Sequence, residues 1–472
     1  MTNNFLGFLL ILAIAAPVYA LLRRDIRIFF LVVLSFCFYA YFDLGFVSIL
    51  GLIIGATYLF SFLLYKSRRE SGLVWVAAIT VSLPLLFYKY IIVWFTDWSF
   101  EWLPVSSLAF GGMEQVLIPV GLSFYTFQCL GYLIDLNKKL YVPENSLLRL
   151  AAFVSFFPQI LAGPIERYPD LSKQLFNSER PHAAMVVDGA TLLLYGIFLK
   201  LAVAERLVDY VDLVFNNIDV LSSMSVFLGF SAFTIQIFAD FCGYTFIALG
   251  TAALFGVKLT NNFLQPFCAV NMVDFWQRWH VSLTRWVGDY VYRPIALYLL
   301  EKNFISSRVA EFLALFVTWL IIGMWHGALF NFAVFGFLQG VLIIITNSFR
   351  RTIKLSQNTR NKFFGFLFTM FCIVLSFGLI RAPDFTSYCE MLRRLFVFDG
   401  ETFLPSGKLE LIIGLSVLVV VEWVFNRTSP LANLRDRLKD VVVVRSAVLS
   451  TLVILIAYLG YDETSAFIYF QY

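Results

Sequence analysis

Long apolar runs recur along almost the whole chain, and they constrain its fold more than any other feature. They include Phe5 to Leu22, Phe46 to Tyr65, Leu73 to Phe95 and Val443 to Gly460. Roughly 20 apolar residues cross a hydrocarbon core of about 30 Å as a helix, so the runs predict about ten to twelve spans. Membrane strands need only about ten residues, and a helix in lipid satisfies its own backbone hydrogen bonds. We therefore expect an all-α, polytopic integral membrane protein.

Composition excludes several other classes of protein. Of the 472 residues, 60% are hydrophobic and 14% are charged, whereas a soluble globular protein carries about 25% charged residues. The net charge of +4 is small for this length and argues against a nucleic-acid partner. The six cysteines are scattered without a C-x-x-C pair, so we predict no metal site. Lipid is therefore expected to surround much of the chain.

The charge of the short connections predicts the orientation of the spans. Three connections are basic and one is acidic: Arg23, Arg24 and Arg27; Lys66, Arg68 and Arg69; Lys138, Lys139 and Arg149; and the acidic stretch Thr96 to Gln115. Because Lys and Arg favour the cytoplasmic side, we expect the amino terminus outside. The run Phe5 to Leu22 has no basic residue before it and no clean cleavage site after it, so we interpret it as a retained span.

We expect one membrane domain, residues 1–472, because the widest polar stretches are about twenty residues long. Within it we distinguish amino-terminal spans (1–115), a central core (116–347) and carboxy-terminal spans (348–472). The core contains helix breakers within hydrophobic stretches: Ile118-Pro119-Val120-Gly121, Ala162-Gly163-Pro164 and Gln265-Pro266. Such breakers predict re-entrant or kinked segments packed inside the protein.

The segment from Val273 to Pro294 is the least lipid-like part of the core. Its large apolar residues recur at steps of three and four: Trp276, Trp279, Leu283 and Trp286. This spacing predicts one helix with these side chains along one side, lying at an interface or capping a cavity.

Two of the three histidines stand in unusual places. His326 lies between an apolar run of about fourteen residues (Phe312 to Trp325), too short to cross, and a run of about nineteen. Gly323 and Gly327 flank it, so the chain is expected to break there with the imidazole at membrane depth. An ionisable group at that depth is a functional hypothesis by default; the alternative is a neutral imidazole bonded to a helix carbonyl.

His280 lies within the tryptophan-rich segment, and its structural and catalytic interpretations both stay open. His182, in the polar loop Glu179 to His182, is interpreted as surface. An imidazole titrates near neutrality, so it can take a proton from a hydroxyl, as acyl transfer from a thioester requires. Asp240 lies in an apolar stretch with Gln236 one turn earlier; it can serve a substrate route, or pair with a Lys or Arg to lock helices together.

Four stretches resemble the membrane-bound O-acyltransferase family. They are IPVGLSFYTFQCLGYLID (Ile118 to Asp135), FPQILAGPIERY (Phe157 to Tyr168), DFWQRWHVSLTRW (Asp274 to Trp286) and GMWHGALFNF (Gly323 to Phe332). The last two place His280 and His326 46 residues apart. The terminal FIYFQY, Phe467 to Tyr472, also resembles sequences of this family. The bacterial branch that the chain resembles contains the membrane subunits of alginate O-acetylation and teichoic-acid D-alanylation.

The resemblance implies re-entrant and interfacial helices around a buried funnel, with His326 as the catalytic histidine and His280 as the second motif histidine. The candidate substrate-binding residues are Trp325, Trp279, Arg278, Asn331 and Asp240. Arg278 and Arg285 could attract the phosphates of a donor. The donor is expected to be acetyl-CoA, another acyl-CoA or an acyl-carrier-protein thioester, used as a co-substrate, with no permanently bound cofactor.

The implied activity is transfer of an acyl group, with acetyl favoured, from the cytoplasmic thioester toward an extracytoplasmic polysaccharide. A separate extracytoplasmic acetyltransferase or esterase-like partner is expected to receive it. D-alanyl transfer to teichoic acid stays open, because Gly243-Tyr244-Thr245-Phe246 resembles the D-alanylation type more closely than the alginate type. Two alternatives come from other classes: a transporter, which shares broken helices and buried polar residues, and a structural subunit that anchors a polymer-export complex.

Overall fold

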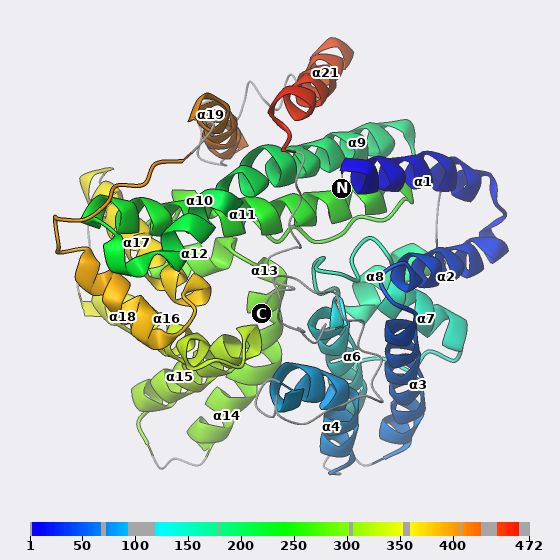
Figure 1. Cartoon of the computed structure of the whole chain (residues 1–472). Coiled ribbons are helices and arrows are strands. Elements are labelled where there is room, and N and C mark those ends of the chain that lie inside the picture. The colour runs from blue at the N-terminus through cyan, green and yellow to red at the C-terminus, as the bar shows by residue number, and fades with distance from the viewer. Residues whose placement is uncertain are drawn as a thin grey trace. The chain divides into compact units, whose positions relative to one another are not determined.

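The computed structural model describes residues 2–67, 72–92, 119–177, 180–301, 305–352, 359–405, 408–425 and 441–461. The acidic stretch Thr96 to Gln115, the terminal Phe467 to Tyr472 and the basic residues Arg68 and Arg69 lie outside the described residues. Regular structure within the described ranges is helical, apart from an isolated bridge between Leu221 and Glu401. The expected all-α fold is confirmed (Figure 1).

The chain divides into two compact units. The amino-terminal unit comprises Asn3–Leu193 and Ile247–Thr260, and the carboxy-terminal unit comprises Met1–Thr2, Leu194–Phe246 and Asn261–Tyr472. The amino-terminal unit holds α1 (Thr2–Leu21), α2 (Arg24–Ala40), α3 (Leu44–Lys66), α4 (Leu73–Leu86), η1 (Phe87–Ile91), α6 (Leu122–Asn137), α7 (Leu147–Ser155) and α8 (Tyr168–Phe176). Helices α9 (Ala183–Phe198) and α11 (Ser223–Leu254) have residues in both units. The three-part division at residues 115 and 347 stays a prediction.

The remaining elements belong to the carboxy-terminal unit. They are η2 (Leu199–Ala204), α10 (Glu205–Asn216), η3 (Ile218–Val220), η4 (Pro266–Cys268), α12 (Met272–Arg278), α13 (Val281–Val287), η5 (Gly288–Tyr292), α14 (Arg293–Glu301), α15 (Ser307–His326), α16 (Phe330–Thr352), α17 (Thr359–Arg381), α18 (Phe385–Arg394), α19 (Lys408–Phe425) and α21 (Val442–Leu459).

Eight helices of the described chain are long and apolar enough to cross a membrane. Two further apolar helices, Leu6–Leu21 and Glu410–Val421, are shorter than this, so the described residues hold eight candidate spans where ten to twelve were predicted for the whole chain. Their apolar side chains need no core of their own, since lipid can cover them. Many of them are accordingly exposed, for example Leu52 at 72% and Trp75 at 72%.

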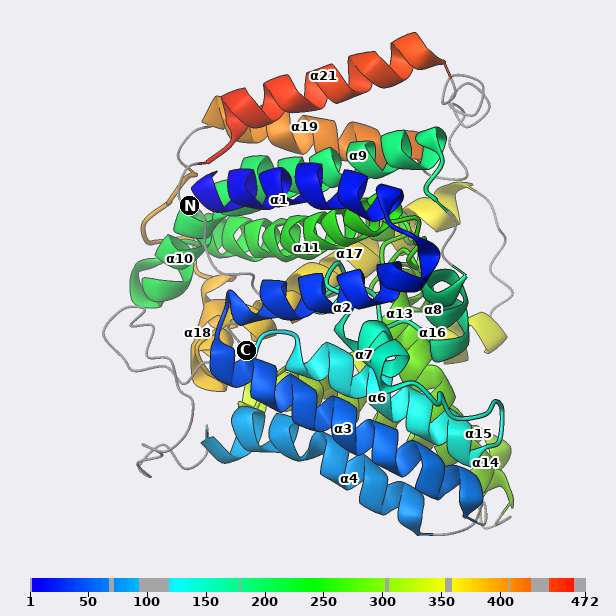
Figure 2. The same cartoon turned by 90° about the vertical axis from the view of Figure 1, so that its right-hand side faces the viewer.

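Helices α3, α4 and α6 of the amino-terminal unit run side by side (Figure 2). Lys139, which follows α6, donates its ammonium protons to the carbonyl oxygens of Leu64 at 2.8 Å and Ser67 at 3.2 Å, at the end of α3. Lys66 and Lys139, which belong to two of the basic connections, therefore lie at one end of this unit. Their common position is what a shared cytoplasmic face requires, although the orientation of the chain itself stays a prediction.

Gly121 explains one of the predicted helix breakers. It precedes α6 with φ +74, in the left-handed region, and a Cβ atom there would lie 2.0 Å from the carbonyl oxygen of Ile160. Only glycine fits both conditions. The motif stretch that begins α6 is thereby packed against the backbone of the FPQILAGPIERY stretch within the same unit.

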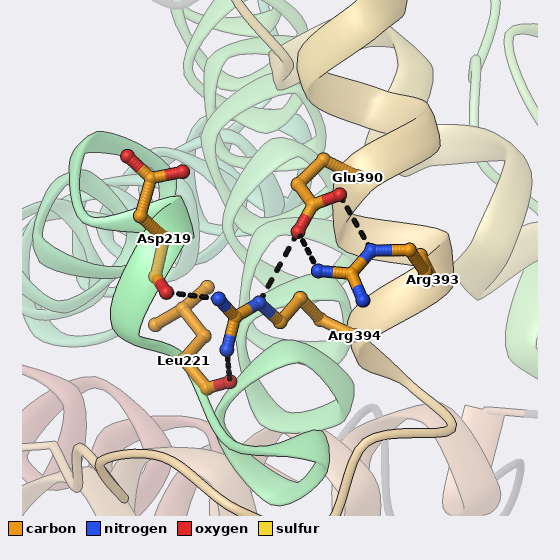
Figure 3. A network of polar contacts seen from close by, with 5 residues as sticks. All are labelled: Asp219, Leu221, Glu390, Arg393 and Arg394. Carbon is orange, nitrogen blue, oxygen red and sulfur yellow. Dashed lines mark hydrogen bonds and ion pairs between the residues drawn. The ribbon is translucent and has the colours of Figure 1, made fainter.

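Helix α18 carries a charged network that reaches the connection between α10 and α11 (Figure 3). Glu390 pairs with Arg393 at 2.6 Å and Arg394 at 3.2 Å, and Arg394 also donates to the carbonyl oxygens of Asp219 and Leu221. Hydrogen bonds from Arg393 hold the pKa of Glu390 down at about 2. The network joins α18 to the connection between α10 and α11.

The network predicts a pH dependence for the attachment of α18. Because the pKa of Glu390 is lowered from its ordinary value of 4.5 to about 2 in the folded protein, its contribution is present above pH 4.5 and is lost as the pH falls toward 2. We expect hydrogen-exchange protection of α18 to decrease over that window. In Glu390→Gln, protection should already be lower at neutral pH and should change little over the same window; an unaltered pH profile in this variant would contradict the assignment.

Candidate active site

His326 is the last residue of α15, and close packing of α15 on α16 fixes its place. A Cβ atom on Gly323 would lie 2.3 Å from the carbonyl oxygen of Phe332, and one on Gly336 would lie 2.3 Å from that of Trp319. The two backbones therefore approach more closely than any side chain would permit. The chain breaks directly after His326, as predicted from its flanking glycines, and α16 begins at Phe330.

One detail of the sequence prediction is wrong. The run ahead of His326 was expected to be too short to cross, but α15 begins at Ser307 and has 20 residues, long enough to span. Ser307, Arg308 and Glu311 belong to the helix ahead of the apolar run. Because these residues are polar or charged, the length of the apolar run alone underestimated the length of the helix. Gly323 also differs from expectation, because it lies inside the helix and serves contact with α16 rather than the break.

The close approach of α15 and α16 predicts the effect of filling it. Gly323→Ala should force the helices apart and lower the free energy of unfolding by about 1–3 kcal/mol, the usual cost of overpacking. Gly55→Ala in α3 is the matched control, since a Cβ atom there meets nothing within 4 Å. Thermal unfolding in detergent should give a lower midpoint for Gly323→Ala than for Gly55→Ala. Equal midpoints would contradict the close approach of α15 and α16.

His280 lies at a sharp break between two short helices. The expected single helix from Val273 to Pro294 is wrong: α12 ends at Arg278 and α13 begins at Val281, with His280 at φ +45. The predicted apolar side nevertheless becomes buried, because Trp276, Trp279, Leu283 and Trp286 are each at most 6% exposed. The break between the two helices turns the imidazole of His280 into the protein interior.

The surroundings of His280 are aromatic. Its side chain lies 4.7 Å from the ring of Phe241 and 6.3 Å from that of Trp325, measured between centroids. His280 is 2% exposed, and this burial lowers its pKa to about 3. The imidazole is therefore neutral at physiological pH, so one ring nitrogen can donate a hydrogen bond while the other accepts one.

Trp325 brings the two motif histidines into one site. Its ring lies 6.3 Å from that of His280 and 4.8 Å from that of His326. His326 also packs edge-on against Phe335 of α16, at 6.0 Å. His326 is partly exposed, whereas Trp325 and His280 are buried. Residues 46 apart in the sequence thus belong to one aromatic cluster within the carboxy-terminal unit.

Three predicted substrate-binding residues have structural contacts. Arg278 pairs with Asp274 at 2.7 Å and donates to the carbonyl oxygen of Leu264. Asn331 donates from Nδ2 to the carbonyl oxygens of Leu379 and Ala382, at the end of α17. Trp279 stacks on Phe275 at 5.6 Å. Their substrate-binding roles stay predictions.

Asp240 belongs to a buried group of three charges. Lys200 of η2 lies 2.8 Å from Asp240 and 2.6 Å from Glu205 of α10, and all three side chains are at most 11% exposed. Asp240 therefore pairs with a lysine, which is what the structural interpretation of this residue requires. Two neighbours of Asp240 on α11, Phe238 and Phe241, instead contact Trp279 and His280. One helix therefore links the charged group to the histidine site.

The sequence did not single out several residues that complete the site. Phe241 and Phe335 contact the two imidazoles, and Asn262 binds the backbone beside His280. Apolar aromatics among 53 phenylalanines carry no distinguishing signal. No cluster of three or more His, Cys, Asp or Glu residues that could hold a metal ion occurs within the described ranges.

Comparison with known proteins places the site within a matched region. A family model described as "MBOAT, membrane-bound O-acyltransferase family" matches residues 140–380, which include both motif histidines. The Probable alginate O-acetylase AlgI of Pseudomonas putida is 28% identical over 440 residues, covering 89% of this chain and 84% of the relative.

Two further relatives carry other names. The Peptidoglycan O-acetyltransferase of Helicobacter pylori is 26% identical over 438 residues, covering 86% of this chain and 79% of its own length. The Teichoic acid D-alanyltransferase of Bacillus subtilis is 27% identical over 299 residues, covering 62% of this chain and 73% of its own length.

Proposed function

This chain belongs to the membrane-bound O-acyltransferase family, and from that premise we propose that it transfers acetyl groups from a cytoplasmic thioester toward an extracytoplasmic polysaccharide. It is an O-acyltransferase and a multi-pass protein of the cytoplasmic membrane. The observation that carries the proposal is the assembly of His280, Trp325 and His326, in which one indole ring contacts both imidazoles. Among the relatives, the alginate and peptidoglycan proteins are named for O-acetylation.

In the proposed mechanism His326 is the general base. It takes the proton of the acceptor hydroxyl while the oxygen attacks the thioester carbonyl. The resulting oxyanion collapses, the bond between carbonyl carbon and sulfur breaks, and the thiolate leaves and takes up the proton from the imidazolium. His280, neutral because it is buried, orients a substrate or assists this proton transfer through a hydrogen bond. The balance requires one thioester and one alcohol, and yields one ester and one thiol.

The donor in this proposal is acetyl-CoA or an acyl-carrier-protein thioester, entering as a co-substrate. Arg285 of α13 is exposed, whereas Arg278 is already paired with Asp274. Of the two arginines, Arg285 is therefore the better candidate for the phosphates of the donor. The proposal includes a water-accessible funnel that leads the acceptor to His326.

A separate extracytoplasmic acetyltransferase or esterase-like protein completes the proposal as the partner that receives the acetyl group. D-alanyl transfer is the alternative within the same reaction class. Gly243-Tyr244-Thr245-Phe246 favours it, and so does the similarity to the Bacillus subtilis protein.

Acyl analysis of the cell's surface polymers, with and without this protein, tests the proposal. We expect ester-linked acetate to fall to background in cells without the protein and to return when the gene is restored. Loss of ester-linked D-alanine with unchanged acetate would support the alternative. Unchanged amounts of both would contradict an acyltransferase acting on these polymers.

A further inference from the structure

His280 holds a backbone conformation that needs outside support. Its φ of +45 lies in the left-handed region, which residues with a Cβ atom seldom adopt. Gln265, on the segment that faces it, is also left-handed at φ +51. His280 occupies the position before α13, yet its own side chain caps none of the free N–H groups of that helix. These groups must find acceptors elsewhere, because they are buried.

Asn262 supplies these acceptors from a distant part of the chain. Its carbonyl oxygen accepts the N–H of Val281 at 3.0 Å, and its Oδ1 accepts the N–H of Ser282 at 3.1 Å. On the other side of His280, the N–H of Leu264 donates to the carbonyl oxygen of Arg278 at 2.9 Å. We call these three bonds the Asn262 clamp. They fix the backbone both before and after His280.

Burial makes the loss of a bond in the clamp costly. Asn262 is fully buried and His280 is 2% exposed, so water cannot replace a lost protein acceptor at little cost. With the backbone fixed, the imidazole is held between Phe241 and Trp325. The clamp therefore sets the direction of a side chain that it does not itself touch.

We propose that Asn262 is a positioning residue for acyl transfer, which fixes the imidazole of His280 by capping the two N–H groups that follow it. The inference rests on the proposed function of His280. A small displacement of a group near the reacting atoms lowers the rate far more than it lowers binding. Loss of the Oδ1 bond to Ser282, the one bond of the clamp that a side chain makes, should therefore lower kcat with little change in KM.

A set of purified variants tests this role in detergent or nanodiscs, with acetyl-CoA as donor, surface polysaccharide with the partner transferase as acceptor, and release of free CoA as the readout. Asn262→Ala should lower kcat at least tenfold, and His280→Ala should lower it as much or more. Because the effect of Asn262 passes through His280, the double variant should be no slower than His280→Ala. Losses that multiply in the double variant would overturn the proposal.

Two variants of similar size keep the test decisive if Asn262→Ala does not fold. Asn262→Asp retains the Oδ1 acceptor at a helix start, where a carboxylate is favourable, and should restore activity to within a fewfold of the native rate. Asn262→Leu fills the same space without an acceptor and should be as slow as Asn262→Ala. Equal activity of Asn262→Asp and Asn262→Leu would show that the Oδ1 acceptor is unimportant and would contradict the proposal.

Asn261→Ala is the matched control. Its side chain accepts the N–H of Phe263 at 3.0 Å in the same loop, so its loss disturbs the loop without removing the clamp. It should stay within twofold of native activity. If His280→Ala itself keeps native activity, the proposed role of His280 fails and this inference fails with it. If His280→Ala is slow while Asn262→Ala is fast, only the inference fails.

Discussion

Replacing His326 by Ala is expected to abolish acyl transfer while the protein still folds and inserts. General-base catalysis contributes about 10²–10⁴-fold to the rate of such reactions, so polymer acetylation in cells should fall below detection. Folding should persist because the ring lies at the end of α15, is partly exposed, and packs in T-shaped geometry with Trp325 and Phe335. The measurement is ester-linked acetate per unit of membrane-inserted protein.

Two further substitutions sharpen this prediction. His326→Gln keeps hydrogen-bonding groups of similar reach but cannot accept the proton, and should be as inactive as the Ala variant. His182→Ala is the control: His182 is exposed, and its Nδ1 accepts the N–H of Met185 near the start of α9. It should acetylate normally. Native activity in His326→Gln would remove the general base from the mechanism.

Removing the ammonium of Lys200 is expected to cause the largest loss of stability. Lys200→Met leaves the carboxylates of Glu205 and Asp240 buried without their partner. Breaking a buried ion pair in this way costs about 3–5 kcal/mol of unfolding free energy. Unfolding measured by titration with a denaturing detergent should show this loss of stability. A variant as stable as the native protein would contradict the pairing of Lys200 with Glu205 and Asp240.

The triple variant Lys200→Met, Glu205→Gln and Asp240→Asn provides the comparison. It removes all three charges together, so most of the stability lost in Lys200→Met should return. It also decides between the two roles of Asp240. A stable triple variant that transfers acetyl normally supports the structural role, whereas a stable but inactive one supports the predicted substrate-binding role.

The sequence predicted the membrane fold and the chain break at His326 for identifiable reasons. Apolar runs near 20 residues leave a helix as the only spanning structure that fits, and eight helices long and apolar enough to span are found among the described residues. The glycines beside His326 predicted the break that follows α15. In each case the information is local, carried by residues within one turn or one span of the feature.

The remaining features depend on contacts between distant residues. Asn262 and Ser282 are 20 residues apart, and Lys200 and Asp240 are 40 apart; no periodicity marks either pair. The expected helix around His280 failed for the same reason. Spacing of Trp276, Trp279 and Leu283 suits a continuous helix, but the clamp from Asn262 supports a left-handed residue at its centre.

Transfer of label across a sealed bilayer tests the central claim most directly. The protein is reconstituted into vesicles with labelled acetyl-CoA enclosed on the side of the basic connections, and polysaccharide with the partner transferase on the other side. The account predicts labelled polymer with the native protein and none with His326→Ala. Equal labelling by the two proteins, or efflux of intact acetyl-CoA without ester formation, would contradict it and favour a transporter.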